Sequence, residues 1–220
     1  LAADLAADPD HLVEAGDMSA VWSRAPAPFV AGPLLNVYSA PAAAELARLG
    51  CVRLCANIEL PVSSITEIAR ACPDLTLELF AFGRLPLALS SRCVQARMEG
   101  LHRDACRYVC DRHPDGMDVA TVEGQAFLAV NGLQTLSHGC QLVDVAVETL
   151  TAAGISALRL SPHSLDMIAV AWAFSAYADG HIAPDELVDR IAALGPPGPL
   201  VSGYLHGAAG ARAAGARAAL

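Results

Sequence analysis

Long apolar runs are missing from the 220-residue sequence, although 54% of its residues are hydrophobic. No run reaches the ~18–20 apolar residues that a membrane-spanning helix needs, because proline, glycine, arginine or aspartate interrupts every candidate. Charged residues make up only 17% of the chain, below the usual share of about a quarter. We therefore expect a compact cytoplasmic protein without a membrane span.

Positive charge is also scarce. Lysine and arginine together number 14 against 23 acidic residues, which gives a net charge of −9. A general nucleic-acid binder needs a basic face to neutralise phosphates. The composition therefore predicts no nucleic-acid partner.

Both common nucleotide-binding fingerprints are absent. No Gly-x-Gly-x-x-Gly follows an expected strand, and no Gly-x-x-x-x-Gly-Lys-Ser/Thr occurs. Instead, short β-rich apolar runs alternate with alanine-rich helical patterns, which predicts an α/β fold with a mostly parallel sheet and helices outside. An open doubly wound sheet and a (β/α) TIM-like barrel both satisfy this pattern, and the missing fingerprints favour the barrel.

The expected elements follow from apolar periodicity and from proline and glycine at helix ends. Ser64 and Glu67 predict a capping box at the start of one helix. Glu123-Gly124 predicts a hairpin turn between two strands. The expected strands are 11–15, 29–38, 52–58, 75–80, 119–121, 125–130 and 155–160, and the expected helices are 41–49, 61–72, 141–153 and 163–178.

Periodicity fails from Gly83 to about Asp118, where glycine, proline, arginine, serine and cysteine dominate. A long irregular stretch inside a compact domain is typical of a functional segment. We expect residues 1–195 to form one α/β domain with a cysteine-bearing insertion at about 83–118, followed by a frayed or loosely helical tail at 196–220. Because the first residues resemble the end of a helix entered midway, we expect the barrel to lack its first strands.

Seven cysteines are present. In a chain that looks cytosolic, cysteines are expected to be buried hydrophobes, ligands or nucleophiles rather than disulfides. Those within or beside apolar elements are expected to be small buried side chains: Cys51, Cys55, Cys72 and Cys140.

The other three cysteines, Cys93, Cys106 and Cys110, fall in the irregular stretch after strand 75–80. The carboxyl end of a barrel strand is where active sites gather. Cys106 and Cys110 are four residues apart, a spacing that places both sulfurs on one side of a helical turn. Three neighbouring thiolates repel one another unless zinc or an iron–sulfur cluster holds them. The spacing alone also allows incidental cysteines.

Several other polar side chains are candidates for roles at such a site. Glu78 lies inside an apolar strand, either paired with an arginine or facing a substrate or cluster pocket. Three arginines either hold an anionic group or form surface salt bridges: Arg84, Arg92 and Arg159. His102 and His113 flank the cysteines and are either exposed loop residues or donors near the site.

The stretch from Glu78 to Cys93 resembles the signature of the collagenase-like peptidase family. Within that family it is most similar to the UbiV-like branch of oxygen-independent ubiquinone biosynthesis. Peptidase-type members carry two cysteines seven residues apart, and Pro86 occupies the first of those positions here. Other segments resemble the same branch: 28–32, 127–137, 158–162 and 202–204.

This resemblance implies a [4Fe–4S] cluster with Cys93, Cys106 and Cys110 as three ligands and a fourth ligand upstream of Leu1. It implies a heterodimer with a UbiU-like protein that hydroxylates a ubiquinone-precursor ring without dioxygen, with prephenate as oxygen source. We therefore expect a non-peptidase subunit of such a complex, with no catalytic residue assigned. A collagenase-like peptidase and a tRNA-modifying hydroxylase of the same family are the alternatives.

Overall fold

The computed structural model of the chain describes residues 11–102 and 105–215. Helices and strands are mixed along the sequence, as the expected α/β class requires. The chain divides into two compact units. Unit 1 comprises Leu1–Ala81, Val145–Arg159 and Gly203–Gly210, and unit 2 comprises Phe82–Asp144, Leu160–Ser202 and Ala211–Leu220.

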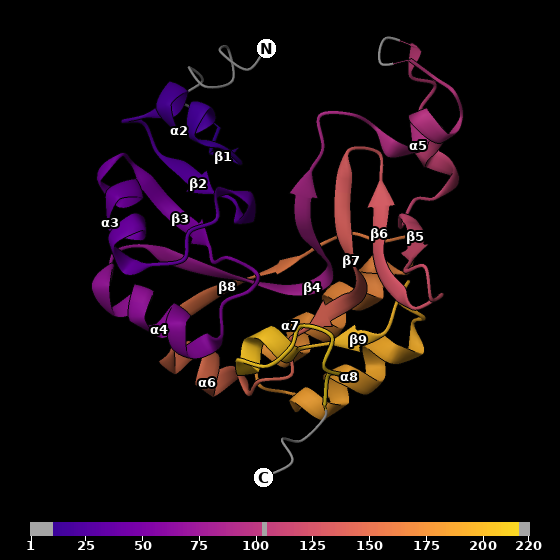
Figure 1. The fold of residues 1–220 in the computed structure, drawn as a ribbon. Helices are drawn as coiled ribbons and strands as arrows, with labels where there is room; N and C mark the ends of the chain where they lie inside the picture. Colours follow the sequence, from indigo (N-terminus) through magenta and orange to yellow (C-terminus); the bar gives the residue numbers. More distant parts are fainter. Residues whose placement is uncertain (1–10, 103–104, 216–220) are drawn as a thin grey trace. The chain divides into compact units, whose positions relative to one another are not determined.

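Unit 1 contains the parallel sheet that the alternation predicts (Figure 1). Its strands pair in sequence order, and residues on one face stand in register, such as Glu14 beside Val30 and Cys55 beside Glu78. The strands are β1 (Val13–Ala15), β2 (Phe29–Ala31), β3 (Cys51–Cys55) and the first part of β4 (Thr76–Leu89). Helices α2 (Met18–Arg24), α3 (Ala40–Arg48) and α4 (Val62–Ala71) connect them.

Local chemistry explains where α3 begins and ends. A proline stands in its first turn, where a missing N–H is tolerated. Gly50 follows its end with φ of 107°, and a Cβ there would lie 2.6 Å from the carbonyl oxygen of Pro26. Only glycine combines that backbone conformation with that close approach. The prediction of this helix is confirmed.

Two predictions near the start of unit 1 were incomplete. Helix α2 was not expected, although Asp17 caps it by accepting hydrogen bonds from the N–H groups of Ser19 and Ala20 at 2.7 and 2.9 Å. The extended run expected through residue 38 ends at β2. Pro33 instead begins the 3₁₀ helix η1 (Pro33–Leu35), because its fixed φ suits a helical first position.

The predicted capping box of α4 is wrong. The residue before the helix is Pro61, which makes no side-chain cap. Glu67 instead pairs with Arg70 within the helix, at 2.6 Å. Helix α4 is held by burial of its apolar face, with Ile65 and Ile68 each 1% exposed. Each such side chain contributes about 1.5–3 kcal/mol.

Helix α6 (Val147–Ala152) and strand β8 (Ile155–Leu160) complete the central elements of unit 1. The helix expected at 141–153 is shorter than predicted at its start. Gly154 follows α6 with φ of 82°, and a Cβ there would lie 2.6 Å from Cβ of Ala69 in α4. The close packing of these two helices therefore depends on that glycine.

Unit 2 contains antiparallel pairing, shown in magenta to salmon in Figure 1. Strand β4 continues to Leu89 and pairs with β7 (Gln134–Leu142), which pairs with β6 (Ala126–Asn131), which pairs with β5 (Met117–Ala120). The hairpin around Gly124 is confirmed. The expected break at Gly83 is wrong, because antiparallel pairing with β7 carries β4 past it, with register shifts on either side of Pro86.

The core of unit 2 is aromatic and aliphatic. Phe174 in α7 (Met167–Ala178) lies 6.1 Å from Phe82 and 6.3 Å from Tyr177, measured between ring centroids. Leu187 and Ile191 of α8 (Pro184–Ala193) are fully buried. Ring pairs at such distances add stability beyond their buried area.

The region expected as a tail contains regular structure. Strand β9 (Leu200–Val201) pairs in parallel with β7, and Gly203–His206 form the 3₁₀ helix η4. The stretch 216–220 lies outside the described residues.

No helix within the described ranges is long and apolar enough to cross a membrane. The parallel strands of unit 1 are consistent with part of a (β/α) barrel, and barrel identity stays a prediction.

Candidate functional site

The three predicted ligands lie in unit 2, in the segment that joins the end of β4 to the start of β5. We call residues 90–102 and 105–116 the cysteine segment. Cys93 caps helix α5 (Val94–Met98), and Cys110 lies in the 3₁₀ helix η3 (Val109–Arg112). Both are half-buried, and Cys106 is exposed. The sequence therefore placed the cysteines correctly after the carboxyl end of the strand, although that end is Leu89 rather than Phe80.

Backbone N–H groups contact two of these sulfurs. The N–H of Ala96 donates to Sγ of Cys93 at 3.3 Å, and the N–H of Tyr108 donates to Sγ of Cys106 at 3.4 Å. Hydrogen bonds from backbone N–H groups to sulfur are also a feature of iron–sulfur sites. All seven cysteines of the chain are free thiols.

Cys106 and Cys110 do not share a helical turn, so that prediction is wrong. The turn is broken by Tyr108, whose φ of 53° is left-handed, and η3 begins only after it. Helix α5 and η3 are nevertheless neighbours. Cys93 and Cys110 therefore lie on adjacent short helices, while Cys106 lies on the connection between them.

Four contacts fix the cysteine segment against the turn between β6 and β7. The N–H of Ser90 donates to the carbonyl of Leu133 at 2.8 Å, and the N–H of Gly132 donates to Oε1 of Gln95 at 2.7 Å. Nδ2 of Asn131 donates to the carbonyls of His113 and Pro114 at 3.1 and 2.9 Å. The two ends of the segment are therefore tied to one hairpin.

A cavity of about 70 Å³ lies between α5 and η3. Its lining combines three apolar side chains with polar and charged ones, among them the Arg112–Glu99 ion pair of 2.9 Å. Gln95 also lines it and is 4% exposed, and its Nε2 has no hydrogen-bond partner among the residues that the structure describes. The lining residues are Gln95, Met98, Glu99, Val109, Arg112, His113 and Met117.

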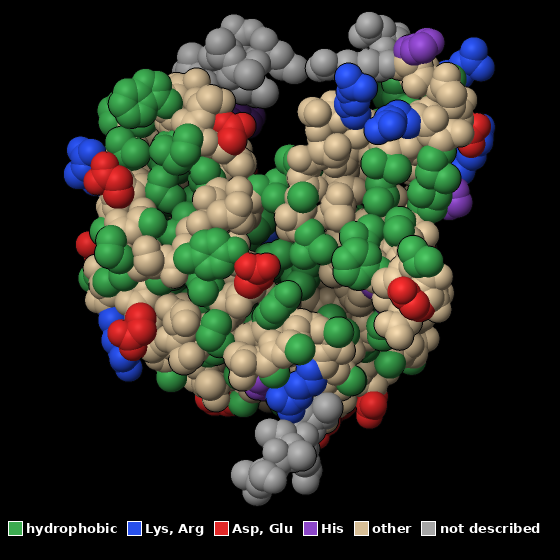
Figure 2. Space-filling view, in the orientation of Figure 1, with side chains coloured by type: hydrophobic (Ala, Val, Ile, Leu, Met, Phe, Trp, Pro, Cys, Tyr) green, Lys and Arg blue, Asp and Glu red, His purple; other side chains and the backbone are tan. Residues whose placement is uncertain are grey.

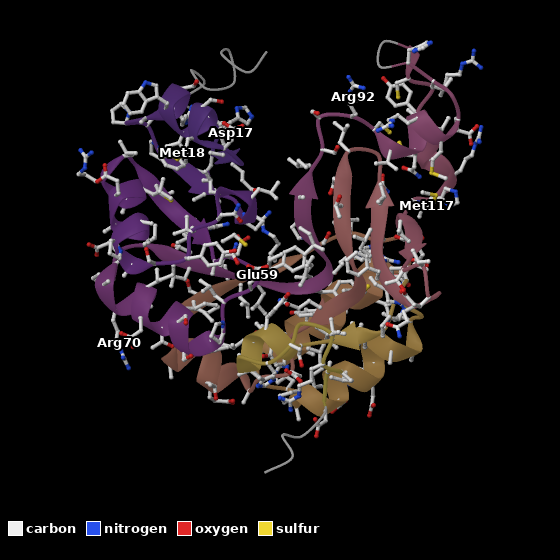
Figure 3. All side chains as sticks on the ribbon, viewed as in Figure 1. Asp17, Met18, Glu59, Arg70, Arg92 and Met117 are labelled. Atoms are coloured by element: carbon white, nitrogen blue, oxygen red, sulfur yellow. The ribbon has the colours of Figure 1, made fainter. Side chains whose placement is uncertain are left out.

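The surface of the cysteine segment mixes basic and apolar side chains, at the upper right of Figure 2. Met98 and Tyr108 are 68% and 72% exposed. Figure 3 shows Arg92 near the start of the segment and Met117 just after its end. Arg92, His102 and His113 are exposed, as the simpler sequence interpretation of the histidines predicted.

The residues fit a thiolate-ligated cluster in chemistry but are not gathered around one point. Three free thiols and two N–H donors to sulfur stand on one segment. Among residues 11–102 and 105–215, no three Cys, His, Asp or Glu side chains lie close enough to hold a metal ion. Binding a cluster therefore requires the segment to draw its sulfurs together.

Arg84 is the centre of a second arrangement in unit 2. Its side chain is 2% exposed and donates to the carbonyls of Ser137, His138 and Pro197, each at 3.0 Å, and to Asp118 at 2.9 Å. Neither expected role, a surface salt bridge or an anion site, describes it. Arg84 is a buried structural residue that holds three backbone carbonyls.

Asp115, at the end of the cysteine segment, bridges two residues of the loop before α7. Its carboxylate contacts Nδ1 of His163 at 3.1 Å, and it accepts hydrogen bonds from both the N–H, at 2.8 Å, and the hydroxyl of Ser164. Burial lowers the pKa of His163, which outweighs the effect of Asp115. Nε2 of this histidine accepts the backbone N–H of Arg84 at 3.0 Å.

This trio contains the residue types of a hydrolase triad but not its connections. A nucleophilic serine donates its proton to histidine. Here the hydroxyl of Ser164 donates to the carboxylate, and both nitrogens of His163 are engaged. No local sequence pattern marks this contact, because it joins residues 48 positions apart. Its geometry serves packing rather than peptide cleavage.

Unit 1 contains a charged cluster on one face of its strands. Arg159 in β8 donates from Nε to Glu78 and from both terminal nitrogens to Glu14. Arg53 lies 3.8 Å from Glu78. Glu78 is only 8% exposed, so its pairing with arginine, one of the two predicted roles, is confirmed.

The four cysteines expected to be buried hydrophobes are buried. Cys51 and Cys72 are 6% and 8% exposed, and Cys55 and Cys140 are 1% or less. Burial raises the pKa of the Cys55 thiol to about 12 and that of Cys140 to about 11. These thiols are therefore poor ligands and poor nucleophiles.

The chain was compared with protein families and with solved structures. No solved structure is significantly similar to it. Residues 19–191 match Peptidase family U32, a span that covers most of both units and includes the whole cysteine segment. The chain therefore belongs to Peptidase family U32, the collagenase-like family whose signature its strand β4 resembles.

Proposed function

We propose that this chain is the [4Fe–4S]-binding subunit of an oxygen-independent hydroxylase in ubiquinone biosynthesis, within the UbiV-like branch of its family. The observation that carries the proposal is the cysteine segment: three free thiols follow the signature strand, and two of their sulfurs accept backbone N–H groups. Pro86 occupies a position where peptidase-type members have a cysteine.

A bound cluster would supply one-electron transfer. The residues of this chain would bind the cluster. Cys93, Cys106 and Cys110 would serve as its ligands, and backbone N–H groups donate to the sulfurs of Cys93 and Cys106. The fourth ligand is a group other than these three thiols. Helices α5 and η3, which carry or follow Cys93 and Cys110, are neighbours.

The partner and the small molecules follow from the same resemblance. We propose a heterodimer with a UbiU-like protein in the cytoplasm, acting on a ubiquinone-precursor ring with prephenate as oxygen source. The peptidase alternative gains no support from the trio of Asp115, His163 and Ser164, because the serine hydroxyl does not face the histidine. The net charge of −9 weighs against a tRNA substrate.

The proposal is tested by loading the protein with iron and sulfide in the absence of air. The buffer contains a small thiol, which can act as an external fourth ligand. We expect broad visible absorbance and about four irons and four sulfides per chain. Cys106→Ser should lower both contents, whereas the matched change of a buried thiol, Cys72→Ala, should not. Wild-type protein without iron and sulfide would overturn the proposal.

A further inference from the structure

Positive charge is unevenly distributed along the chain. Lysine is absent, and five of the 14 arginines fall within the stretch 90–116, which carries four acidic residues. The rest of the chain carries nine arginines against 19 acidic residues. Figure 2 shows blue side chains of the cysteine segment gathered at the upper right. The segment is therefore a local positive region on a protein whose net charge is −9.

Three of these arginines have no ionic partner among the described residues. Arg92, Arg97 and Arg107 are exposed, and none forms an ion pair in the part of the chain that the structure describes. The fourth described arginine of the segment, Arg112, pairs with Glu99. Elsewhere, exposed arginines pair with a glutamate one turn away on the same helix: Arg48, Arg70 and Arg190. The three unpaired guanidinium groups can therefore bind carboxylates from outside the chain.

Apolar side chains are exposed beside these arginines. Helix α5 buries Gln95 and Ala96, so its opposite face turns outward. Val94, Arg97 and Met98 are separated by three and four residues around the helix and share that face. Val94 and Met98 are both exposed. One short helix therefore presents a cation together with two apolar side chains.

Tyr108 adds an exposed aromatic ring to the same segment. Its φ of 53° is a conformation that is rare for bulky residues, and such conformations cluster at functional sites. Tyr108 directly precedes Val109, which lines one cavity together with Met98, so its backbone lies close to α5. The segment therefore combines an aromatic side chain, two aliphatic ones and three unpaired cations.

We propose that the outer surface of the cysteine segment docks an acidic face of a partner protein. This inference rests on the proposed function, and the partner is the UbiU-like protein named there. Arginine and tyrosine are enriched among the residues that carry most of the binding energy at protein interfaces. Carboxylates of the partner pair with the three guanidinium groups, and an apolar patch between them covers Met98 and Tyr108. The docking surface consists of Arg92, Val94, Arg97, Met98, Arg107 and Tyr108.

RNA, a second class of anionic partner, fits this surface less well. It also binds arginine and aromatic side chains. However, RNA carries negative charge along its whole length, so it would meet the acidic excess of the rest of the chain. An acidic face on a protein is limited to the docking area. The charge distribution therefore favours a protein partner.

The experiment measures the affinity of this chain for the purified UbiU-like protein by biolayer interferometry without air, at about 50 and about 300 mM salt. Iron and sulfide are assayed in the same samples. Arg97→Glu should weaken binding by at least about tenfold at low salt, with a smaller loss at high salt. Tyr108→Asn should weaken it by about tenfold at both, because asparagine tolerates the left-handed backbone but lacks the ring.

The matched control is Arg70→Glu, at an exposed arginine of α4. It makes the same change of net charge as Arg97→Glu but lies outside the docking surface. Because salt screens charges that are distant from an interface, we expect it to change the affinity by less than about twofold.

The outcomes separate this inference from the proposed function. If both Arg97→Glu and Tyr108→Asn keep the wild-type affinity, this inference alone is overturned. If wild-type protein takes up iron and sulfide but does not bind the UbiU-like protein, the proposed heterodimer fails and the docking surface fails with it. Binding that depends on both residues in protein without iron and sulfide supports the surface while the cluster proposal fails. Tighter binding of a single-stranded RNA oligonucleotide, abolished by Arg97→Glu, would assign the surface to RNA and overturn the inference.

Discussion

The two units use arginine in different ways. In unit 1, Arg159 is held by two carboxylates, those of Glu14 and Glu78, which stand on strands of one sheet. In unit 2, Arg84 is held mainly by backbone carbonyls, those of Ser137 and His138 in β7 and that of Pro197 before β9. The first arrangement balances charge on a strand face. The second fixes the loops and strands from which the cysteine segment projects, so it positions the candidate site.

The largest expected difference between the units is in thiol reactivity. Burial raises the pKa of Cys55 to about 12, so at pH 8 about one thiol in ten thousand is ionised there. Cys106 is exposed. We expect iodoacetamide to label Cys106 at least about a thousandfold faster than Cys55 in folded protein. Peptide mass spectrometry measures both rates, and equal rates would contradict the burial difference.

Removing Arg84 should have the largest effect on stability. Arg84→Met leaves three carbonyls without their buried donor. We expect the free energy of unfolding to fall by about 4 kcal/mol, measured by urea denaturation. Arg92→Met, at an exposed arginine, should change it by less than about 0.5 kcal/mol. A loss below about 1 kcal/mol at Arg84, on the order of one ordinary hydrogen bond, would refute its structural role.

Removing Arg159 should lower the free energy of unfolding somewhat less than removing Arg84. Its side chain is 25% exposed and Glu14 is 42% exposed, but Glu78 would remain buried and charged. We expect Arg159→Met to lower the free energy of unfolding by about 3 kcal/mol. Adding Glu78→Gln should restore part of that loss, because it removes a buried carboxylate that is left with only Arg53, at 3.8 Å, as its cation. If the second change adds to the loss, Glu78 is stabilised by other contacts.

The contacts of Arg159 and Arg84 also differ in how far they could be predicted from the sequence. The Glu78–Arg159 pair was within reach, since strands 75–80 and 155–160 are both readable from alternation and a carboxylate in an apolar strand needs a cation. Arg84 was not, since its acceptor on Pro197 lies 113 residues away. The extension of β4 beyond Gly83 could not be predicted either, because it also depends on a partner that is distant in sequence. Its partner is β7, whose pairing no local pattern encodes.

The candidate site also has features that the sequence predicted and features that it did not. Cys93, Cys106 and Cys110 follow strand β4, and their role as ligands stays a prediction. The expected helical turn over Cys106 and Cys110 failed, because the left-handed Tyr108 lies between them. Gln95 carries no signal in sequence. Its buried amide is defined by Gly132, 37 residues away.

The smallest expected effect is a pH dependence in unit 2. Burial lowers the pKa of His163 below its ordinary value, so the folded state binds this proton less readily than the unfolded chain. Its contribution to stability is therefore complete above about pH 6.5 and is lost as the pH falls from there toward the folded pKa.

His163→Gln removes the titration while an amide can replace both of its hydrogen bonds. We expect the variant to lose less stability than wild type between about pH 7.5 and pH 5.5, as measured by urea denaturation. His102→Gln, at an exposed histidine, should follow the wild-type curve, and parallel curves for all three proteins would show that His163 is not the titrating group.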